Sequence, residues 1–280
     1  MKPLKSCAGG SAEGNRCFFM REKIIRKIRR KLANKENLLI SAPRRIGKTS
    51  LLKHLRDTPE ENQIIIYLIV QSVASVDEFN KRLFDELTKD QQIYGWFERS
   101  RKQINAGIKR QASRVQSISL EGGIKINPNE NIDYYAERNA LLDEPQQHDK
   151  QIILFIDEFP DVLTNIDKED KKANRNDAIT LLQQQREIRE KYKNGHIQFA
   201  YTGSTGLKNV VRKLGDIHLV NNLNEIKVPP FTRQEAAELM QRLILGKQED
   251  LEDFNISDEV IEYTVDKIQW PLPLPPITFY

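Results

Sequence analysis

The chain has 280 residues, of which 30% are charged and 39% are hydrophobic, and its formal net charge is +4. This length allows one large α/β domain plus a smaller one, and the composition is that of an ordinary globular protein. The longest apolar run, Ile64–Val70, is far too short to cross a membrane, and residues 1–14 lack the apolar core of a secretory signal. We therefore expect a cytoplasmic protein with no membrane partner.

The N-terminal region is rich in glycine and serine, and we expect residues 1–15 to be flexible. Cys7 and Cys17 lie in or next to this region and have no metal-ligand spacing with the four histidines. We expect free thiols in a reducing compartment. A predicted helix follows Phe18, and its polar face is strongly basic. Such a face can contact nucleic-acid phosphates, although it is more often simply solvated.

Residues 42–49 read APRRIGKT and match the phosphate-loop pattern G-x-x-x-x-G-K-[ST] at every position except Ala42. A short apolar run precedes the motif and a helix-compatible segment follows it, which is the context that the motif requires. Backbone N–H groups of such a loop, and of the helix N-terminus after it, surround a β-phosphate. Gly47 permits close approach of the backbone, Lys48 reaches the β- and γ-phosphates, and Thr49 offers a hydroxyl to Mg²⁺. We expect the whole loop and its first helical residues to bind nucleotide: Ala42, Pro43, Arg44, Arg45, Ile46, Gly47, Lys48, Thr49 and Ser50.

Strands and helices alternate after the loop. Residues 63–70 predict a strand that is buried on both faces of a parallel sheet. Ser75 and Glu78 have the spacing of a capping box, which opens a helix. Residues 89–150 read as an insertion, with a helix near 91–105 and a hairpin that pairs Ile118 and Leu120 with Ile124 and Ile126.

Residues 151–159 read QIILFIDEF and predict a buried strand that delivers Asp157 and Glu158 at its carboxyl end. Ligands bind at this edge of parallel sheets. We expect Asp157 to hold Mg²⁺ alongside Thr49, directly or through water. Glu158 is then placed to polarise the water that attacks the γ-phosphate of ATP.

Residues 197–202 predict the next strand, which ends in Thr202 and Ser204. These hydroxyls are candidates to sense the γ-phosphate or the attacking water, and ordinary turn chemistry is an equal alternative. Residues 167–176 read as a charged loop, and 178–193 as a helix. This helix carries Arg186 and Arg189, which with Arg44 and Arg45 are candidates for γ-phosphate contacts, although a structural role is the simpler explanation for each. No Asn-Lys-x-Asp stretch follows the loop, which favours ATP over GTP.

The last third of the chain predicts a short strand at 224–228, two prolines, and a helix opened by the capping box of Thr232 and Glu235. Ser257 is expected to cap a further helix that turns its apolar residues inward: Val260, Ile261, Val265 and Ile268. Residues 270–276 read WPLPLPP and cannot remain helical for long.

These motifs together resemble the prokaryotic AAA+-like P-loop ATPases of the STAND branch, whose loop often reads PRRxGKTSLL. The resemblance rests on FFMRE at 18–22, APRRIGKTSLL at 42–52, FIDEF at 155–159, TGSTGL at 202–207 and VPPFT at 228–232. It implies the P-loop NTPase three-layer α/β sandwich, with a parallel sheet in the order 5-1-4-3-2. It also implies an ATPase core over residues 16–228, with the insertion at 89–150, and a partial helical lid over 229–280.

The resemblance places Phe19 and Arg21 near the adenine, and Pro273 in a lid motif that closes over the nucleotide. Met20 stands where many members have glycine. Family members usually continue beyond the lid proline into a winged helix and an effector domain, whereas seven residues follow Pro273. A partner protein or effector domain is therefore expected to be supplied elsewhere, unless the chain is a truncated version.

Three functions remain open from the sequence. The first is an ATPase that hydrolyses Mg-ATP and acts as a nucleotide-dependent switch. The second is an ATPase that handles nucleic acid through the basic helix or the insertion. The third is a nucleotide-binding scaffold with little turnover. ATP and Mg²⁺ are the expected cofactors.

Overall fold

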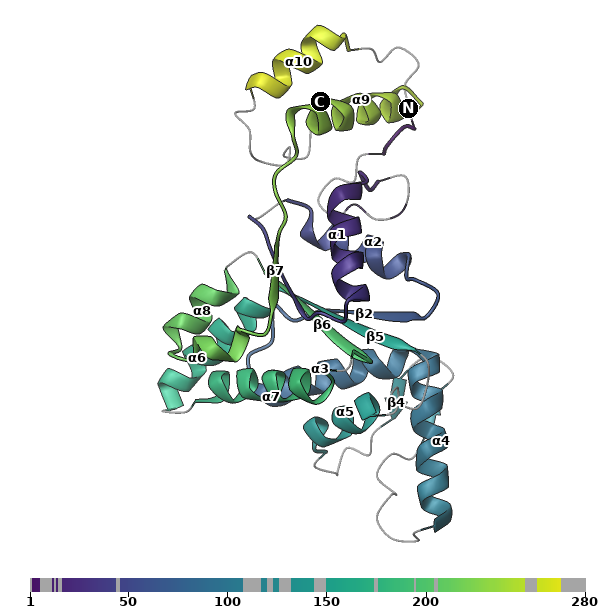
Figure 1. The fold of residues 1–280 in the computed structure, drawn as a ribbon, viewed down its shortest axis with the longest axis vertical. Helices are drawn as coiled ribbons and strands as arrows, with labels where there is room; N and C mark the ends of the chain where they lie inside the picture. The colour runs from purple at the N-terminus through teal and green to yellow at the C-terminus, as the bar shows by residue number, and fades with distance from the viewer. Residues whose placement is uncertain are drawn as a thin grey trace. The chain divides into compact units, whose positions relative to one another are not determined.

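A computed structural model of the chain describes residues 2–5, 12, 14, 17–43, 46–107, 117–119, 123–125, 132–143, 150–173, 176–193, 195–203, 206–249 and 256–267. The chain divides into two compact units (Figure 1). The first consists of Met1–Arg30, Ile40–Thr58 and Glu225–Tyr280, and the second of Lys31–Leu39 and Pro59–Asn224. None of the helices in the described part of the chain has the length and apolarity that a membrane crossing requires.

Five strands form one sheet in the order β2-β5-β6-β1-β7. They are β1 (Leu38–Ser41), β2 (Gln63–Ile69), β5 (Gln151–Asp157), β6 (Ile197–Gly203) and β7 (Asn224–Lys227). β5 runs parallel to both β2 and β6. When these five strands are counted in chain order, the arrangement is 5-1-4-3-2. The predicted P-loop NTPase fold class is therefore confirmed.

The strands differ in burial, and the difference follows their places in the sheet. Six of the seven residues of β5, and all of β6, are buried. β2 lies at the edge of the sheet and alternates between buried and half-exposed residues, and 49% of Ile69 is exposed. The prediction that β2 is buried on both faces is therefore wrong, because an edge strand is covered less completely than a central one.

The helices of the second unit form one apolar core with β2, β5 and β6. They are α3 (Val76–Lys89), α4 (Gln91–Gly107), α5 (Tyr134–Asp143), α6 (Phe159–Ala173), α7 (Asp177–Lys191), α8 (Leu207–Lys213) and the short 3₁₀ helix η2 (Ile217–Val220). Ser75 caps α3, because its hydroxyl accepts a hydrogen bond from the Glu78 N–H at 3.2 Å. The predicted helix cap is confirmed.

The charged run that begins at Asp167 is not a loop, because α6 continues through it to Ala173. Asp167 pairs with Lys171 one turn later at 2.6 Å. Asp170 is buried and accepts a hydrogen bond from the Ala178 N–H in the first turn of α7 at 2.9 Å. Charges at this spacing support a helix, and the density of charge alone is a poor indicator of a loop.

The insertion contains the predicted helix, as α4, and the predicted hairpin. β3 (Ser117–Ser119) pairs antiparallel with β4 (Gly123–Lys125), and Ile118 lies opposite Ile124 as predicted. Leu120 and Ile126 lie outside the described residues. α5 packs against α3 and α4, and its Tyr135 hydroxyl donates to Glu187 of α7 at 2.9 Å.

The first unit contains α2 (Lys48–Asp57), α9 (Arg233–Gln248), α10 (Asp258–Lys267) and most of α1 (Glu22–Ala33). The last turn of α1, after Arg30, is assigned to the second unit. The predicted capping box at Thr232 and Glu235 is present with both of its hydrogen bonds. α9 and α10 pack through a small apolar cluster: Ala236, Met240, Ile244, Ile261 and Val265. Val260 was expected to face inward and is instead 51% exposed, and Ile268 lies outside the described residues.

Two features of the N-terminal region differ from what its composition indicates. Leu4 is fully buried, and its N–H donates to the Arg242 carbonyl of α9 at 2.7 Å. Cys17 is disulfide-bonded, so the prediction of a free thiol at this position is wrong. The other cysteine of the chain, Cys7, lies outside the described residues. The absence of metal-ligand spacing excluded a metal site and did not exclude a disulfide.

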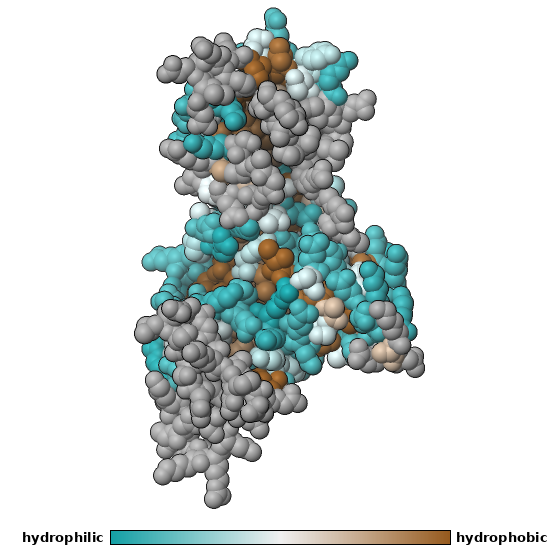
Figure 2. Space-filling view, turned by 180° about the vertical axis from the view of Figure 1, so that it is seen from behind, coloured by the Kyte–Doolittle hydropathy of each residue, from teal (hydrophilic) through white to brown (hydrophobic). Residues whose placement is uncertain are grey.

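A few large apolar side chains reach the surface, and two of them, Val260 and Tyr263, lie one turn apart on α10. The most exposed of them are Met20, Ile69, Leu245, Val260 and Tyr263. On the face shown in Figure 2, hydrophobic residues appear in small groups among hydrophilic ones.

Candidate functional site

The phosphate loop lies in the first unit, between β1 and α2. Ser41 at the end of β1 donates from its hydroxyl to Glu225 at 2.8 Å, and its carbonyl accepts from the Val228 N–H at 2.9 Å. Gly47 caps α2 with φ at 83°, in the left-handed region. An added Cβ would meet no atom within 4 Å, so glycine is required there for its backbone conformation rather than for space.

Lys48 is folded back over the loop. Its side chain is buried, and Nζ donates to the carbonyl oxygens of Ala42 and Pro43, both at 3.1 Å. The ammonium group is therefore held at the mouth of the loop, beside the N-terminus of α2. Ile46 is buried, and Thr49 is half-buried directly after Lys48. Arg44 and Arg45 lie outside the described residues.

Ser50 contacts the N-terminal region. Its hydroxyl accepts a hydrogen bond from the Ala12 N–H at 2.9 Å. We expected Ser50 to bind nucleotide. In the structure, its hydroxyl contacts the backbone of Ala12, which belongs to the same unit.

Phe19 and Arg21 are both buried against the segment that leads into α9. Arg21 donates from Nη2 to the Pro229 carbonyl at 2.6 Å, and its guanidinium lies 4.6 Å from the centre of the Phe231 ring. The Phe19 ring meets the Phe231 ring edge-on at 5.4 Å. Burial lowers the pKa of Arg21, and the Glu235 carboxylate acts in the opposite direction. The residues expected near the adenine therefore contact the segment between β7 and α9.

Asp157 lies at the carboxyl end of β5 in the second unit, and it is 2% exposed. Its Oδ2 accepts from the Tyr67 hydroxyl at 2.7 Å, and its Oδ1 accepts from the Thr202 hydroxyl and from the Glu158 N–H. The donors come from the strands on both sides of β5 and from the next residue of the chain. The predicted metal ligand is thus a buried carboxylate in a dense set of hydrogen bonds.

Glu158 follows with φ at 59°, and it is one of two non-glycine residues in the described part of the chain with positive φ. Backbone in this region costs a residue with a Cβ about 1–2 kcal/mol, and such residues concentrate at functional sites. The conformation turns the chain sharply between β5 and α6, which begins at Phe159.

Thr202 was proposed as a sensor of the γ-phosphate, and its hydroxyl is used on Asp157. Ser204 lies outside the described residues. Sequence reasoning missed Tyr67, because this residue stands within an apolar run that reads only as a strand. A hydroxyl-bearing residue in such a run, close to its carboxyl end, is the signal that was available.

Arg186 and Arg189 both stabilise the segment around η2. Arg186 donates from Nη1 to the His218 carbonyl at 2.6 Å. Arg189 is buried and donates to Asn222, Tyr201 and the Leu219 carbonyl at 3.1, 3.0 and 2.6 Å. These contacts favour the structural interpretation of both arginines over a role on phosphate.

The donor set suits Mg²⁺ bound together with a nucleotide. In the part of the chain that the structure describes, no three His, Cys, Asp or Glu side chains come together as a metal site of their own. Mg²⁺ typically uses one or two carboxylates plus substrate phosphates and water. Asp157 supplies such a carboxylate in the second unit, and Thr49 supplies a hydroxyl in the first.

The sheet order, with a phosphate loop between β1 and α2, gives the fold of P-loop NTPases. A solved structure with the same fold is the Walker-type ATPase PABY2304 of Pyrococcus abyssi, with a TM-score of 0.56 and 18% identity over 95% of this chain. A second is the ORC2 protein of Aeropyrum pernix in ADPNP–ADP complexes, with a TM-score of 0.51 and 16% identity over 88% of this chain. At these identities the likeness shows a shared fold.

This chain spans 65% of the first of these proteins and 55% of the second. No protein-family model and no curated protein matches the sequence.

Proposed function

We propose that the chain binds ATP with Mg²⁺, hydrolyses it, and acts as a nucleotide-dependent switch. The observation that carries this proposal is Lys48, held by the Ala42 and Pro43 carbonyls beside the left-handed Gly47. Anionic phosphate oxygens offer an ammonium group stronger hydrogen bonds than neutral carbonyls do. A β-phosphate would therefore displace the two carbonyls and engage the N–H groups at the start of α2.

The remaining roles follow from the residue chemistry. Thr49 and Asp157 take part in Mg²⁺ binding, and Glu158 orients and polarises a water molecule. That water attacks the γ-phosphorus, and the bond to the β–γ bridging oxygen breaks, which yields ADP and phosphate. The name of the Pyrococcus protein and the nucleotides in the Aeropyrum complexes support this assignment.

The finer assignments belong to the same proposal. Phe19 and Arg21 lie on the adenine side. Pro273, which the resemblance assigns to a motif that closes over the nucleotide, lies outside the described residues. The link between Arg21 and Pro229 supports the adenine side, because it joins the segment before α1 to the start of the lid within one unit. We assign the chain to the STAND branch of AAA+-like ATPases, with an effector domain or partner protein as the recipient of the switch.

Two variants test this function. Lys48→Ala should weaken ATP binding by about 100-fold, since it removes a charge-assisted contact to two phosphates. Glu158→Gln should bind ATP normally and lower the hydrolysis rate by about 10²–10⁴. Lys213→Ala, which removes an exposed lysine of α8, is the control and should change neither quantity.

The outcomes separate the possibilities. Retained tight ATP binding in Lys48→Ala overturns the site. Equal inactivity of the wild type and Glu158→Gln, with ATP still bound by both, overturns the enzyme and favours a nucleotide-binding scaffold.

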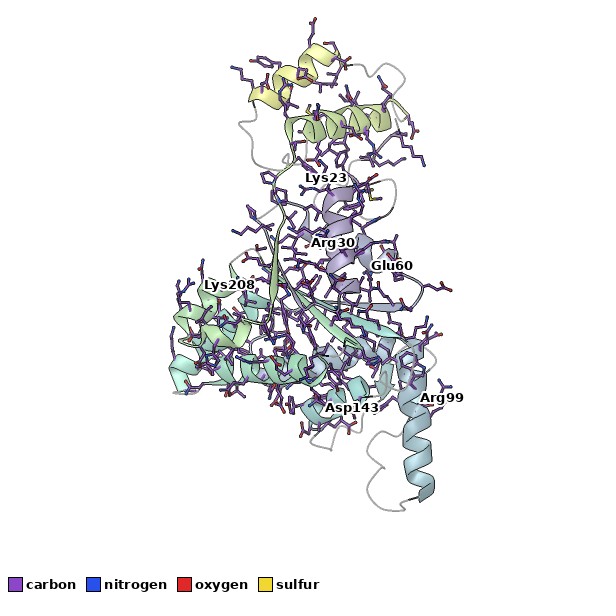
Figure 3. The ribbon with its side chains drawn as sticks, viewed as in Figure 1. Lys23, Arg30, Glu60, Arg99, Asp143 and Lys208 are labelled. Carbon is purple, nitrogen blue, oxygen red and sulfur yellow. The ribbon has the colours of Figure 1, made fainter. Side chains whose placement is uncertain are left out.

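A basic stripe on α1 favours nucleic-acid handling as the second candidate. Lys23, Lys27 and Arg30 are exposed and lie at positions i, i+4 and i+7, so they share one helix face. Figure 3 labels Lys23 and Arg30 on this helix. None of the three has an ion-pair partner among the described residues, unlike Arg26, which pairs with Glu22 at 3.7 Å.

A salt titration of DNA binding tests this candidate. Three phosphate contacts predict a slope of about −3 in log K against log salt, and replacing the three residues with glutamine should remove it. No binding at low salt contradicts the candidate.

A further inference from the structure

The Asp157 carboxylate is fixed from both sides by the strands that flank it. Ile69 of β2 is the register partner of Asp157, and Tyr67 lies two residues earlier on the same strand. Side chains two residues apart point to the same face of a sheet, so Tyr67 and Asp157 share a face. Residues in this diagonal relation on neighbouring strands lie about 7–8 Å apart. A tyrosine side chain is long enough to bring its hydroxyl across this separation to the carboxylate.

Thr202 approaches from the other side. Tyr201 of β6 is the register partner of Ile156, so the next residue of each strand brings Thr202 beside Asp157. A short hydroxyl side chain is sufficient at this position, and its hydroxyl bonds to Oδ1. The two carboxylate oxygens thus have different hydroxyl donors, Tyr67 on Oδ2 and Thr202 on Oδ1. This pair of bonds prevents rotation of the carboxylate about its Cβ–Cγ bond.

The surroundings make these bonds strong. Asp157 is 2% exposed and Thr202 is fully buried, so neither bond competes freely with water. Hydrogen bonds to an ionised group in a buried site are stronger than neutral bonds at the surface. In metal sites, partners of this kind orient the ligand, and their loss lowers metal affinity about 10–100-fold.

We infer that Tyr67 is a positioning residue for the metal, and that Tyr67 and Thr202 together orient Asp157 toward nucleotide-bound Mg²⁺. This inference rests on the proposed ATPase function. It gives Thr202 a role on the carboxylate in place of a role on the γ-phosphate. Neither Tyr67 nor Thr202 needs to contact the nucleotide in order to affect its binding.

The test is the effect of Mg²⁺ on ATP affinity in Tyr67→Phe, which keeps the ring and removes the hydroxyl. The dissociation constant of a fluorescent ATP analogue is measured in excess Mg²⁺ and in EDTA. The variant should match the wild type within twofold in EDTA, and should lose about 10–100-fold of the affinity that Mg²⁺ adds. A merely structural role would change both values or neither.

Tyr94→Phe is the matched control. Its hydroxyl donates to Glu98 at 2.6 Å on α4, so the substitution also removes a tyrosine–carboxylate bond, away from Asp157. This control should leave both constants unchanged. Thr202→Val should reproduce the loss seen in Tyr67→Phe, and Thr202→Ser, which retains a hydroxyl, should restore most of the Mg²⁺ effect.

The possible failures are distinguishable. If the wild type binds no ATP analogue under either condition, the proposed function and this inference both fail. If Mg²⁺ tightens binding equally in the wild type and Tyr67→Phe, the ATP site stands and the positioning role of Tyr67 is wrong. If Thr202→Val alone loses the Mg²⁺ effect, the pairing of the two hydroxyls is wrong.

Discussion

Glu158 combines an unfavourable backbone conformation with the place in the sequence expected for the water-polarising acid. Its φ of 59° lies in the left-handed region, which asparagine tolerates better than glutamate or glutamine. We predict that Glu158→Asn raises the free energy of unfolding by about 0.5–1 kcal/mol and abolishes ATP hydrolysis. Urea denaturation and a phosphate-release assay measure the two effects.

Glu158→Gln is the control for this prediction, because glutamine removes the acid without relieving the backbone. It should lose hydrolysis and gain no stability. Equal stability of the two variants would show that the left-handed backbone is not a source of strain.

His54 of α2 gives the first unit a pH dependence. Its ring stacks on Phe18 at a centroid distance of 4.5 Å. Burial lowers the pKa of His54 below its usual 6.5, Arg29 lowers it further, and Asp57 acts in the opposite direction. The native state therefore binds fewer protons than the unfolded state in the interval from the lowered pKa up to 6.5. Within this interval, the contribution of His54 to stability falls as the pH falls.

His54→Phe tests the direction, because phenylalanine keeps an aromatic ring against Phe18 and does not titrate. The thermal midpoint of the wild type minus that of the variant should become more negative as the pH is lowered from about 7.5 to about 5.5. A difference that moves in favour of the wild type would mean that protonated His54 is stabilised in the fold.

At the scale of the elements, Gly246 lets α9 meet the N-terminal segment. A Cβ at this position would overlap the backbone oxygen and carbon of Leu4, whose N–H donates to Arg242. We predict that Gly246→Ala lowers the free energy of unfolding by about 1–3 kcal/mol, because backbone atoms yield less easily than a side chain. Urea denaturation followed by circular dichroism measures the loss.

Gly95 of α4 provides the control, because an added Cβ there would meet no atom within 4 Å. Gly95→Ala should raise stability by up to about 1 kcal/mol through helix propensity. If both substitutions stabilise the protein, the contact between Leu4 and α9 does not contribute to its stability.

Elements with a strong local signal were predictable from the sequence. The strand that ends in Asp157, the N-cap at Ser75 and the capping box at Thr232 needed only short-range patterns. Tyr67 stands out in the sequence only as a hydroxyl-bearing residue in an apolar run, and its contact with Asp157 was not predictable, because it depends on which strand lies beside β5 and in which register. Long-range pairing of this kind leaves no local trace in a single sequence.

Arg138 of α5 shows the same limit inside the insertion. A basic residue in a polar segment is expected at the surface, and Arg138 is fully buried with its guanidinium 4.8 Å from the centre of the Tyr135 ring. Burial lowers the pKa of Arg138 to about 10, and the nearby tyrosines and Glu187 only partly offset this effect. The environment of such a residue is set by tertiary contacts rather than by the segment that contains it.

At the scale of the whole molecule, the two compact units are interleaved along the chain. The first unit gathers the phosphate loop, α9 and α10, which are far apart in sequence, and the second contains Asp157 and Glu158. The sequence motifs follow chain order and cannot show this grouping. Because two units need not unfold together, a single midpoint does not describe the whole molecule unless the transitions coincide.

Nucleotide binding should therefore be visible as a shift of the transition that involves the first unit, which carries Gly47, Lys48 and Arg21. ATP with Mg²⁺ at 100 times its dissociation constant stabilises the bound state by about 2.7 kcal/mol. For a protein of this size we expect the midpoint to rise by about 5–10 °C in scanning calorimetry.

GTP should give a smaller shift, because the guanine-reading Asn-Lys-x-Asp stretch is missing from the sequence. At the same ATP concentration, Lys48→Ala should retain only a small part of the shift, about 0.4 kcal/mol for a site weakened about 100-fold. Equal shifts with ATP and GTP would refute the adenine preference, and a full shift in Lys48→Ala would place the nucleotide outside the phosphate loop.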